Sequence, residues 1–256
     1  MQAGISAASR GHDVVIYERD LHAGGQVRLA ASVPNRAEFG DIIRNQLHEL
    51  QRLQVKLLLG HEATAHTVMA EQPDLVIVAT GSAPARPYWA PGDATRIVDV
   101  VDVLSGAARP EAGERVVVVD ELGFHQATSV SELLADRGCR VEILTPAMVV
   151  AQDLGITLDL EGFCIRAAAR GIVLTPDSVV MGWDAAASQL SVLHHVSGRM
   201  LQVDADWVVL AVPGSPVDAL YRELAASGLD VRRVGDCLAP RRVHSAVVEG
   251  DRAGAS

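Results

Sequence analysis

The sequence predicts an α/β fold built from two similar βαβ units, the second inserted in the first. Short apolar strands alternate with helices along the 256 residues. Such alternation favours parallel sheets with right-handed crossover connections. A helix end, a glycine turn and a buried strand also occur twice, at residues 10–18 and at residues 137–145. This internal repeat indicates two units of related design.

The first part of the chain alternates between helical and strand patterns. Apolar residues recur at helical spacing between Glu38 and Leu53. An alanine-rich helix is expected at 2–9 and ends before Gly11. Strands are expected at 13–18, 55–59 and 74–78. Residues 82–114 are rich in Pro, Gly and Ala and are interpreted as a connector.

The second part opens with the strongly apolar strand 115–120. Helices are expected at 126–136, 158–169, 217–226 and 243–255. Further strands are expected at 140–144, 172–175, 179–183, 189–194, 200–203, 207–212 and 231–235. The strands at 179–183, 189–194 and 200–203 would form a meander. We therefore predict a first domain from residues 1–110 plus 207–256, and an inserted domain from residues 111–206.

Composition argues against several classes of protein. The net charge is -10 and no run of like charges forms an arm, which disfavours nucleic acid and an anionic membrane as partners. The N-terminus lacks a basic segment followed by a long apolar run, so we expect a cytoplasmic protein without a signal peptide. Cys139, Cys164 and Cys237 lie far apart, outside any metal-ligand spacing. His194 and His195 are adjacent on a strand and would point to opposite faces, so no metal site is expected.

Two segments near the start have the residue types of a dinucleotide site. Glu18 ends a predicted strand, where an acid binds the adenosine ribose in such units. It is otherwise a solvated strand-end glutamate. Gly24-Gly25-Gln26 follows, and paired glycines let the backbone approach a pyrophosphate. The alternative is an ordinary turn.

Two further segments follow the ends of predicted strands. Ala79-Thr80-Gly81 provides small residues where the chain turns at the carboxyl edge of the sheet. Gly235-Asp236 ends the last strand, and an aspartate there accepts a hydrogen bond from a ribityl hydroxyl. Arg241-Arg242 fits a phosphate contact and a solvated turn equally well.

Together these segments resemble the FAD half of the pyridine nucleotide-disulfide oxidoreductase type of Rossmann-like flavoprotein. The string Tyr17-Glu18-Arg19, with Gly24-Gly25-Gln26 and the ending from Gly235 to Arg241, is more specific. It resembles the C-terminal FAD/NAD(P)-binding region of the 2,4-dienoyl-CoA reductase, trimethylamine dehydrogenase and histamine dehydrogenase family. These are Old yellow enzyme-like flavin oxidoreductases, and the resemblance covers essentially the whole chain.

The resemblance implies FAD, or only its ADP part, as cofactor. It also implies a separate or fused TIM barrel with FMN and a 4Fe-4S centre as partner. The last glycine of the family's GxGxxG loop would fall immediately before Met1, so we expect an N-terminally truncated member that is inactive alone. No residue is convincing as a catalytic acid, base or redox cysteine.

The inserted domain departs from the family's dinucleotide pattern. Leu122 and Phe124 stand where glycines are expected, and Thr145 replaces the ribose-binding acid. Binding of NAD(P) is therefore doubtful. The alternative to a flavin module is a non-catalytic scaffold that binds ADP or nothing. A short-chain dehydrogenase is disfavoured because no tyrosine precedes a lysine at the required spacing. The substrate, the electron partner and the oligomeric state stay open.

Overall fold

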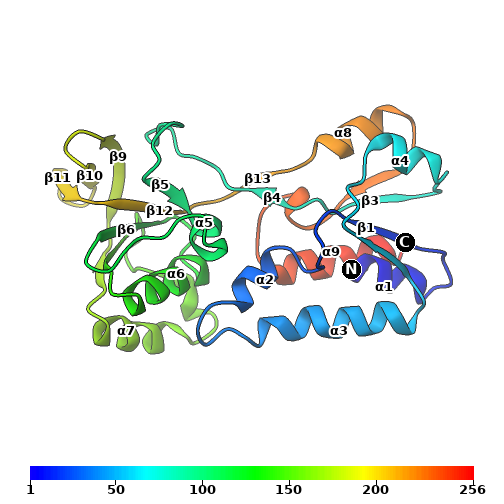
Figure 1. Ribbon diagram of the computed structural model, residues 1–256, viewed down its shortest axis with the longest axis horizontal. Coiled ribbons are helices and arrows are strands. Elements are labelled where there is room, and N and C mark those ends of the chain that lie inside the picture. Colours follow the sequence, from blue (N-terminus) through cyan, green and yellow to red (C-terminus); the bar gives the residue numbers. More distant parts are fainter. The chain divides into compact units, whose positions relative to one another are not determined.

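A computed structural model describes residues 1–256 and divides them into two compact units (Figure 1). Unit 1 consists of residues 1–31, 36–83 and 214–256. Unit 2 consists of residues 32–35 and 84–213. The chain therefore builds most of unit 2 between two segments of unit 1, as an insertion requires. None of the helices combines the length and the apolarity that crossing a membrane requires.

Unit 1 contains two separate pairs of parallel strands. Strands β1 and β2 form one pair, and β3 and β14 form the other. Short strands β4 and β13 pair antiparallel. The helices are α1 (Gln2–Ala8), α2 (Gln26–Ala31), α3 (Phe39–Arg52), α4 (Ala65–Ala70), α8 (Ala219–Ala226) and α9 (Val243–Gly254). The strands are β1 (Val15–Glu18), β2 (Lys56–Leu59), β3 (Val76–Val78), β4 (Ser82–Ala83), β13 (Ser215–Pro216) and β14 (Val231–Arg233).

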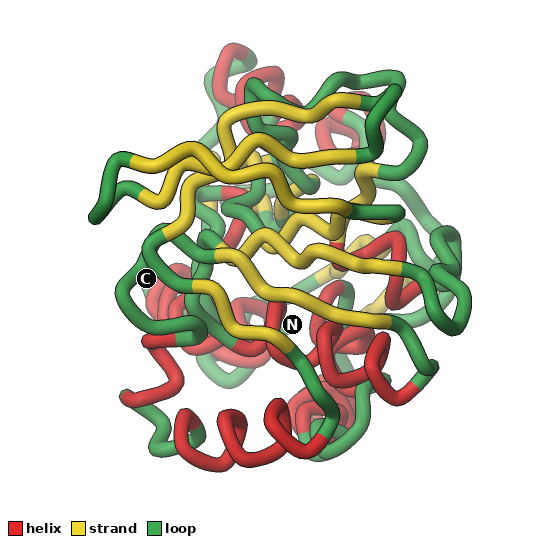
Figure 2. Tube along the Cα trace, turned by 90° about the vertical axis from the view of Figure 1, so that its left-hand side faces the viewer, coloured by secondary structure: helices red, strands yellow, loops and turns green.

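Unit 2 contains a parallel sheet in the order β5-β12-β6-β7-β8 and an antiparallel meander of β9, β10 and β11 (Figure 2). Its helices are α5 (Val100–Ser105), α6 (His125–Asp136) and α7 (Leu160–Ala169). The parallel strands are β5 (Ile97–Asp99), β6 (Arg115–Asp120), β7 (Arg140–Leu144), β8 (Val173–Thr175) and β12 (Trp207–Ala211). The meander strands are β9 (Ser178–Asp184), β10 (Gln189–His194) and β11 (Arg199–Asp204).

Strand β6 is the centre of unit 2 because both of its faces are buried. Val116 and Val118 face one apolar cluster, which includes Leu134 and Phe163. Val117 and Val119 face the other cluster, on the opposite side of the sheet. Side chains alternate between faces along a strand, so a run of four valines supplies both cores. This explains why the strand has no polar face.

The predicted α/β class and the meander are confirmed, and the internal repeat has a structural counterpart. Helix α1 leads through Gly11 into β1, and α6 leads through Gly138 into β7. Both glycines have positive φ, +89° and +87°, as a helix C-terminus that turns sharply into a strand requires.

The interpretation of residues 82–114 as a plain connector is wrong, because the segment holds β4, β5 and α5. The Asp99 side chain caps α5 by accepting hydrogen bonds from the N–H groups of Val101 and Asp102, at 2.7 and 3.0 Å. Asp102 in turn accepts from the Asp99 N–H. This reciprocal cap, together with Gly106 after the helix, is a local sequence signal for a helix at α5. The high Pro and Gly content of the surrounding segment obscured it. Helices α2 and α4 are also additions to the predicted elements.

The unit boundaries differ from the predicted domain boundaries, 1–110 plus 207–256 and 111–206. Strand β12 pairs with both β5 and β6. Residues 84–110 and 207–213 therefore lie in unit 2. The unit boundary thus depends on pairing between strands that are distant in sequence, and local sequence patterns do not predict such pairing.

Helices α1 and α9 approach each other more closely than side chains would allow. A Cβ added at Gly254 would lie 2.1 Å from the Ala3 carbonyl oxygen, and one at Gly250 would lie 3.3 Å from the Ala3 nitrogen. Across the same contact, the Ser6 hydroxyl donates to Asp251 at 2.5 Å. This hydrogen bond holds the pKa of Asp251 below its ordinary value. The two ends of the sequence are thereby joined within unit 1.

We expect Gly254→Ala to lower the free energy of unfolding of unit 1 by about 1–3 kcal/mol, because the added methyl group overpacks the α1–α9 contact. Gly40→Ala in α3 is the matched control, since an added Cβ there meets nothing nearer than Ala31 at 3.9 Å. It should be neutral or stabilise by up to about 1 kcal/mol. Urea denaturation followed by circular dichroism measures both. Equal effects of the two substitutions would contradict the proposed contact.

Each two-stranded parallel sheet of unit 1 has strand edges without a ladder partner. Lys56 N–H donates to the Val14 carbonyl, so alternate residues of β1 face β2 and the main-chain groups of Tyr17 face the other way. By the same alternation, Ile77 of β3 faces away from β14.

Open strand edges recruit other chains. We expect the purified chain to self-associate, which light scattering measures; a sharp, reversible melt of a monomer would refute this.

Candidate functional site

Glu18 lies at the carboxyl end of β1, as expected. Its Oε1 accepts a hydrogen bond from the N–H of Asp20 at 2.9 Å, which shapes the following loop. A carboxylate has further lone pairs, so it is able to accept additional hydroxyl donors. Burial lowers the pKa of the Met1 α-amino group, and the nearby Glu18 charge partly opposes that effect. Arg19 is exposed, and its Nε lies 3.8 Å from Asp20 Oδ1.

The two glycines of the Gly24-Gly25 pair differ in their surroundings, because one is packed against a helix and the other is open. Gly24 packs against α3, because an added Cβ would lie 2.4 Å from Cδ1 of Ile43. Gly25 has φ of +48° and no atom within 4 Å of an added Cβ. Only Gly25 therefore offers bare backbone of the kind that a phosphate group requires.

The segment after β3 is fixed to the segment before α8. The Thr80 hydroxyl contacts the Val217 carbonyl and lies 3.3 Å from Cys237 Sγ. The Gly81 carbonyl accepts from the Val217 N–H at 3.0 Å. Ala79-Thr80-Gly81 thus joins β3 to the chain that returns from unit 2.

Gly235 and Asp236 follow β14 and are held by α9 and the loop before it. The Gly235 N–H donates to Glu249 Oε2 at 2.8 Å. Asp236 Oδ1 accepts from the Arg241 N–H at 3.1 Å. The Arg241 guanidinium pairs with Glu249. This ion pair is neither the phosphate contact nor the solvated turn that the sequence suggested for Arg241.

Ser82 connects three of these segments, and sequence reasoning did not single it out. Gln26 Nε2 lies 3.2 Å from the Ser82 hydroxyl oxygen, which lies 3.3 Å from Asp236 Oδ2. The loops after β1, β3 and β14 therefore meet at one point. The available signal was position, because Ser82 directly follows the Ala79-Thr80-Gly81 segment.

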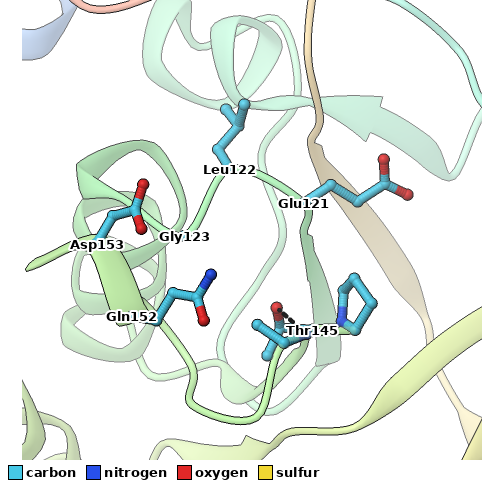
Figure 3. Close-up of a pocket in the computed structure, with 8 residues that line it drawn as sticks. Glu121, Leu122, Gly123, Thr145, Gln152 and Asp153 are labelled. Atoms are coloured by element: carbon cyan, nitrogen blue, oxygen red, sulfur yellow. Dashed lines mark hydrogen bonds between the residues drawn. The ribbon is translucent and has the colours of Figure 1, made fainter. Parts of the chain in front are cut away.

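Unit 2 has a pocket of about 410 Å³ at the carboxyl ends of β6 and β7 (Figure 3). Ligands of open α/β sheets bind at this edge. Carboxylates of Glu121 and Asp153 lie at the pocket, with no lysine or arginine. The lining residues are Glu121, Leu122, Gly123, Thr145, Pro146, Ala147, Gln152 and Asp153.

A buried carboxylate already accepts hydrogen bonds from main-chain N–H groups of the loop beside this pocket. Asp120 is fully buried at the end of β6. Its Oδ1 accepts hydrogen bonds from Leu122 N–H at 3.1 Å and Gly123 N–H at 2.8 Å. Burial raises the pKa of the Asp120 carboxyl, although these N–H groups act to lower it. Two donors that a pyrophosphate would need are thus engaged internally.

No protein-family model matches the chain. A probable N-methylproline demethylase of Rhizobium meliloti (strain 1021) is 30% identical over 98% of the chain and 41% of the relative. The chain thus spans about two fifths of the length of the curated relatives it matches. A 6-hydroxypseudooxynicotine amine oxidase of Pseudomonas geniculata N1 is 28% identical, with a TM-score of 0.91 over 99% of the chain and 39% of that protein.

Histamine dehydrogenase of Rhizobium sp. 4-9 has a TM-score of 0.92 over 99% of the chain and 41% of its own length. Its identity of 20% supports the fold alone.

We expect NADH and NADPH to bind with a Kd no lower than about 100 μM. This limit corresponds to about 5.5 kcal/mol of binding free energy. The acidic pocket and the engaged N–H groups disfavour a pyrophosphate, whereas Phe124 packs against the apolar cluster around Val118. Fluorescence titration with each nucleotide measures this. Saturable binding that Asp153→Arg strengthens would show that unit 2 is a working nucleotide site.

Proposed function

We propose that this chain, which matches the C-terminal FAD-binding region of the 2,4-dienoyl-CoA reductase, trimethylamine dehydrogenase and histamine dehydrogenase family, is a dinucleotide-binding module of a flavin-dependent oxidoreductase. Unit 1 is the FAD-binding unit and unit 2 is a degenerate NAD(P)-binding-like unit. Both are Rossmann-like in this proposal. The module binds and orients its cofactor without itself supplying a catalytic residue.

The meeting of three strand-end loops is the observation that carries this proposal. Gln26, Ser82 and Asp236 come from segments distant in sequence, yet they form one hydrogen-bonded row. Glu18 stands at the end of β1, within the same unit. Ligands of such folds bind where the carboxyl ends of the strands converge.

The residues present fit an adenine dinucleotide. Glu18 would accept hydrogen bonds from the adenosine ribose, and the uncovered backbone at Gly25 would lie toward phosphate. Asp236, held on both of its oxygens, would accept from a ribityl hydroxyl. A bound flavin would supply the electron transfer chemistry, which side chains do not provide.

The rest of the enzyme would supply the substrate site. The curated relatives carry more than half of their length outside the matched region. A separate or fused TIM barrel with FMN and a 4Fe-4S centre is the partner we propose. In that arrangement unit 1 holds FAD, or only its ADP part, beside the barrel.

Absorbance of the purified chain separates the two candidate functions. A band near ~450 nm, released as FAD by denaturation, is the result expected of a flavin module. Colourless protein that binds ADP, or nothing, would instead identify a non-catalytic scaffold. The spectrum after incubation with excess FAD and gel filtration provides the measurement.

We expect Glu18→Gln to weaken binding of ADP and FAD by about ten- to a hundredfold, because a charged acceptor of the ribose hydroxyls is lost. The amide retains an oxygen for the Asp20 N–H, so the loop should stay folded. Glu223→Gln on the exposed side of α8 is the control. Calorimetric titration measures both, and unchanged affinity in Glu18→Gln would exclude Glu18 as a ligand.

A further inference from the structure

Resting on the proposed function, we infer that Ser82 is a positioning residue that orients the Asp236 carboxylate and thereby favours FAD over ADP. Ser82 opens β4, directly after the turn at Gly81. In the proposed function, Ser82 lies toward the flavin side of the dinucleotide, away from the adenosine anchor at Glu18.

The Ser82 hydroxyl is confined by its surroundings. Its residue is paired with Pro216 in the β4–β13 ladder, which fixes the backbone. Gly214 packs against it, because an added Cβ there would lie 3.2 Å from the Ser82 hydroxyl oxygen. The paired backbone confines the Ser82 side chain, and the lack of a side chain at Gly214 leaves room for its hydroxyl.

The direction of the hydrogen bonds is set by chemistry. Gln26 approaches Ser82 through its amide nitrogen, which only donates. The single Ser82 proton is therefore free to be donated to Asp236 Oδ2. The row runs one way, from amide to hydroxyl to carboxylate, and it ends on a charged acceptor.

Asp236 is consequently held at both oxygens. Oδ2 receives the Ser82 proton at 3.3 Å, and Oδ1 receives the Arg241 N–H at 3.1 Å. Each carboxylate oxygen has a second lone pair. The carboxylate thus stays able to accept a hydroxyl of a ligand while its plane is fixed, and ADP has no ribityl hydroxyl to offer it.

The neighbouring hydroxyl of Thr80 has a different role. It contacts the Val217 carbonyl and Cys237 Sγ, and has no bond to Asp236. Thr80 joins the same two segments of chain without orienting the carboxylate. Among the hydroxyl groups of this turn, Ser82 is the one that bonds to Asp236.

Calorimetric titration of the full chain with FAD and with ADP tests the inference. Ser82→Ala should weaken FAD binding by about tenfold and leave ADP binding unchanged, since one hydrogen bond to a charged group is lost. Ser82→Thr keeps the hydroxyl and should restore the affinity for FAD. Ser215→Ala, an exposed serine of the pairing strand β13, is the matched control.

Hydrogen exchange gives a readout that needs no ligand. With Asp236 loosened by Ser82→Ala, the Arg241 amide that donates to it should exchange faster, and Ser215→Ala should leave it unchanged. Equal losses for ADP and FAD, or no loss for either, would overturn the role of Ser82 alone. A wild-type chain that binds neither ligand would overturn the proposed function, and this inference with it.

Discussion

Unit 1 depends on the close approach of α1 and α9. These helices come from opposite ends of the sequence, and the glycines of α9 let its backbone lie against Ala3. The hydrogen bond from Ser6 to Asp251 fixes their relative position. Strand β14 pairs with β3 directly before Gly235, and the Gly235 N–H donates to Glu249 of α9. The strand pairing and the packing of α9 against α1 therefore together hold Asp236 beside the segment that follows β3.

The two units differ in how they treat the main-chain N–H groups that follow a parallel strand. Such groups must either form hydrogen bonds within the protein or stay accessible to water or a ligand. In unit 1, Gly25 leaves its backbone uncovered and Asp236 keeps free lone pairs. In unit 2, Asp120 turns back on Leu122 and Gly123 and engages their N–H groups within the protein. In the proposed function, similar elements therefore allow ligand access in unit 1, whereas in unit 2 they are closed by hydrogen bonds within the protein.

This chain matches about two fifths of the length of its curated relatives. The likeness extends over nearly all of its own length, so both units have counterparts there. The proposed module, which positions a cofactor while substrate chemistry takes place elsewhere in the assembly, agrees with a candidate site made of hydrogen-bond acceptors and small residues.

Local patterns in the sequence were enough to predict the α/β class, the repeat around Gly11 and Gly138, the strand of valines at 116–119, and the strand-end positions of Glu18 and Asp236. These follow from local periodicity and turn chemistry, which act over a few residues. The tertiary structure was needed to show that residues 84–110 and 207–213 lie in unit 2, because β12 pairs with β6 and with β5, 91 and 111 residues earlier in the chain. It also shows that the Ser82 hydroxyl meets Asp236, since a serine after a glycine turn has no local property that reveals which distant carboxylate its hydroxyl will meet.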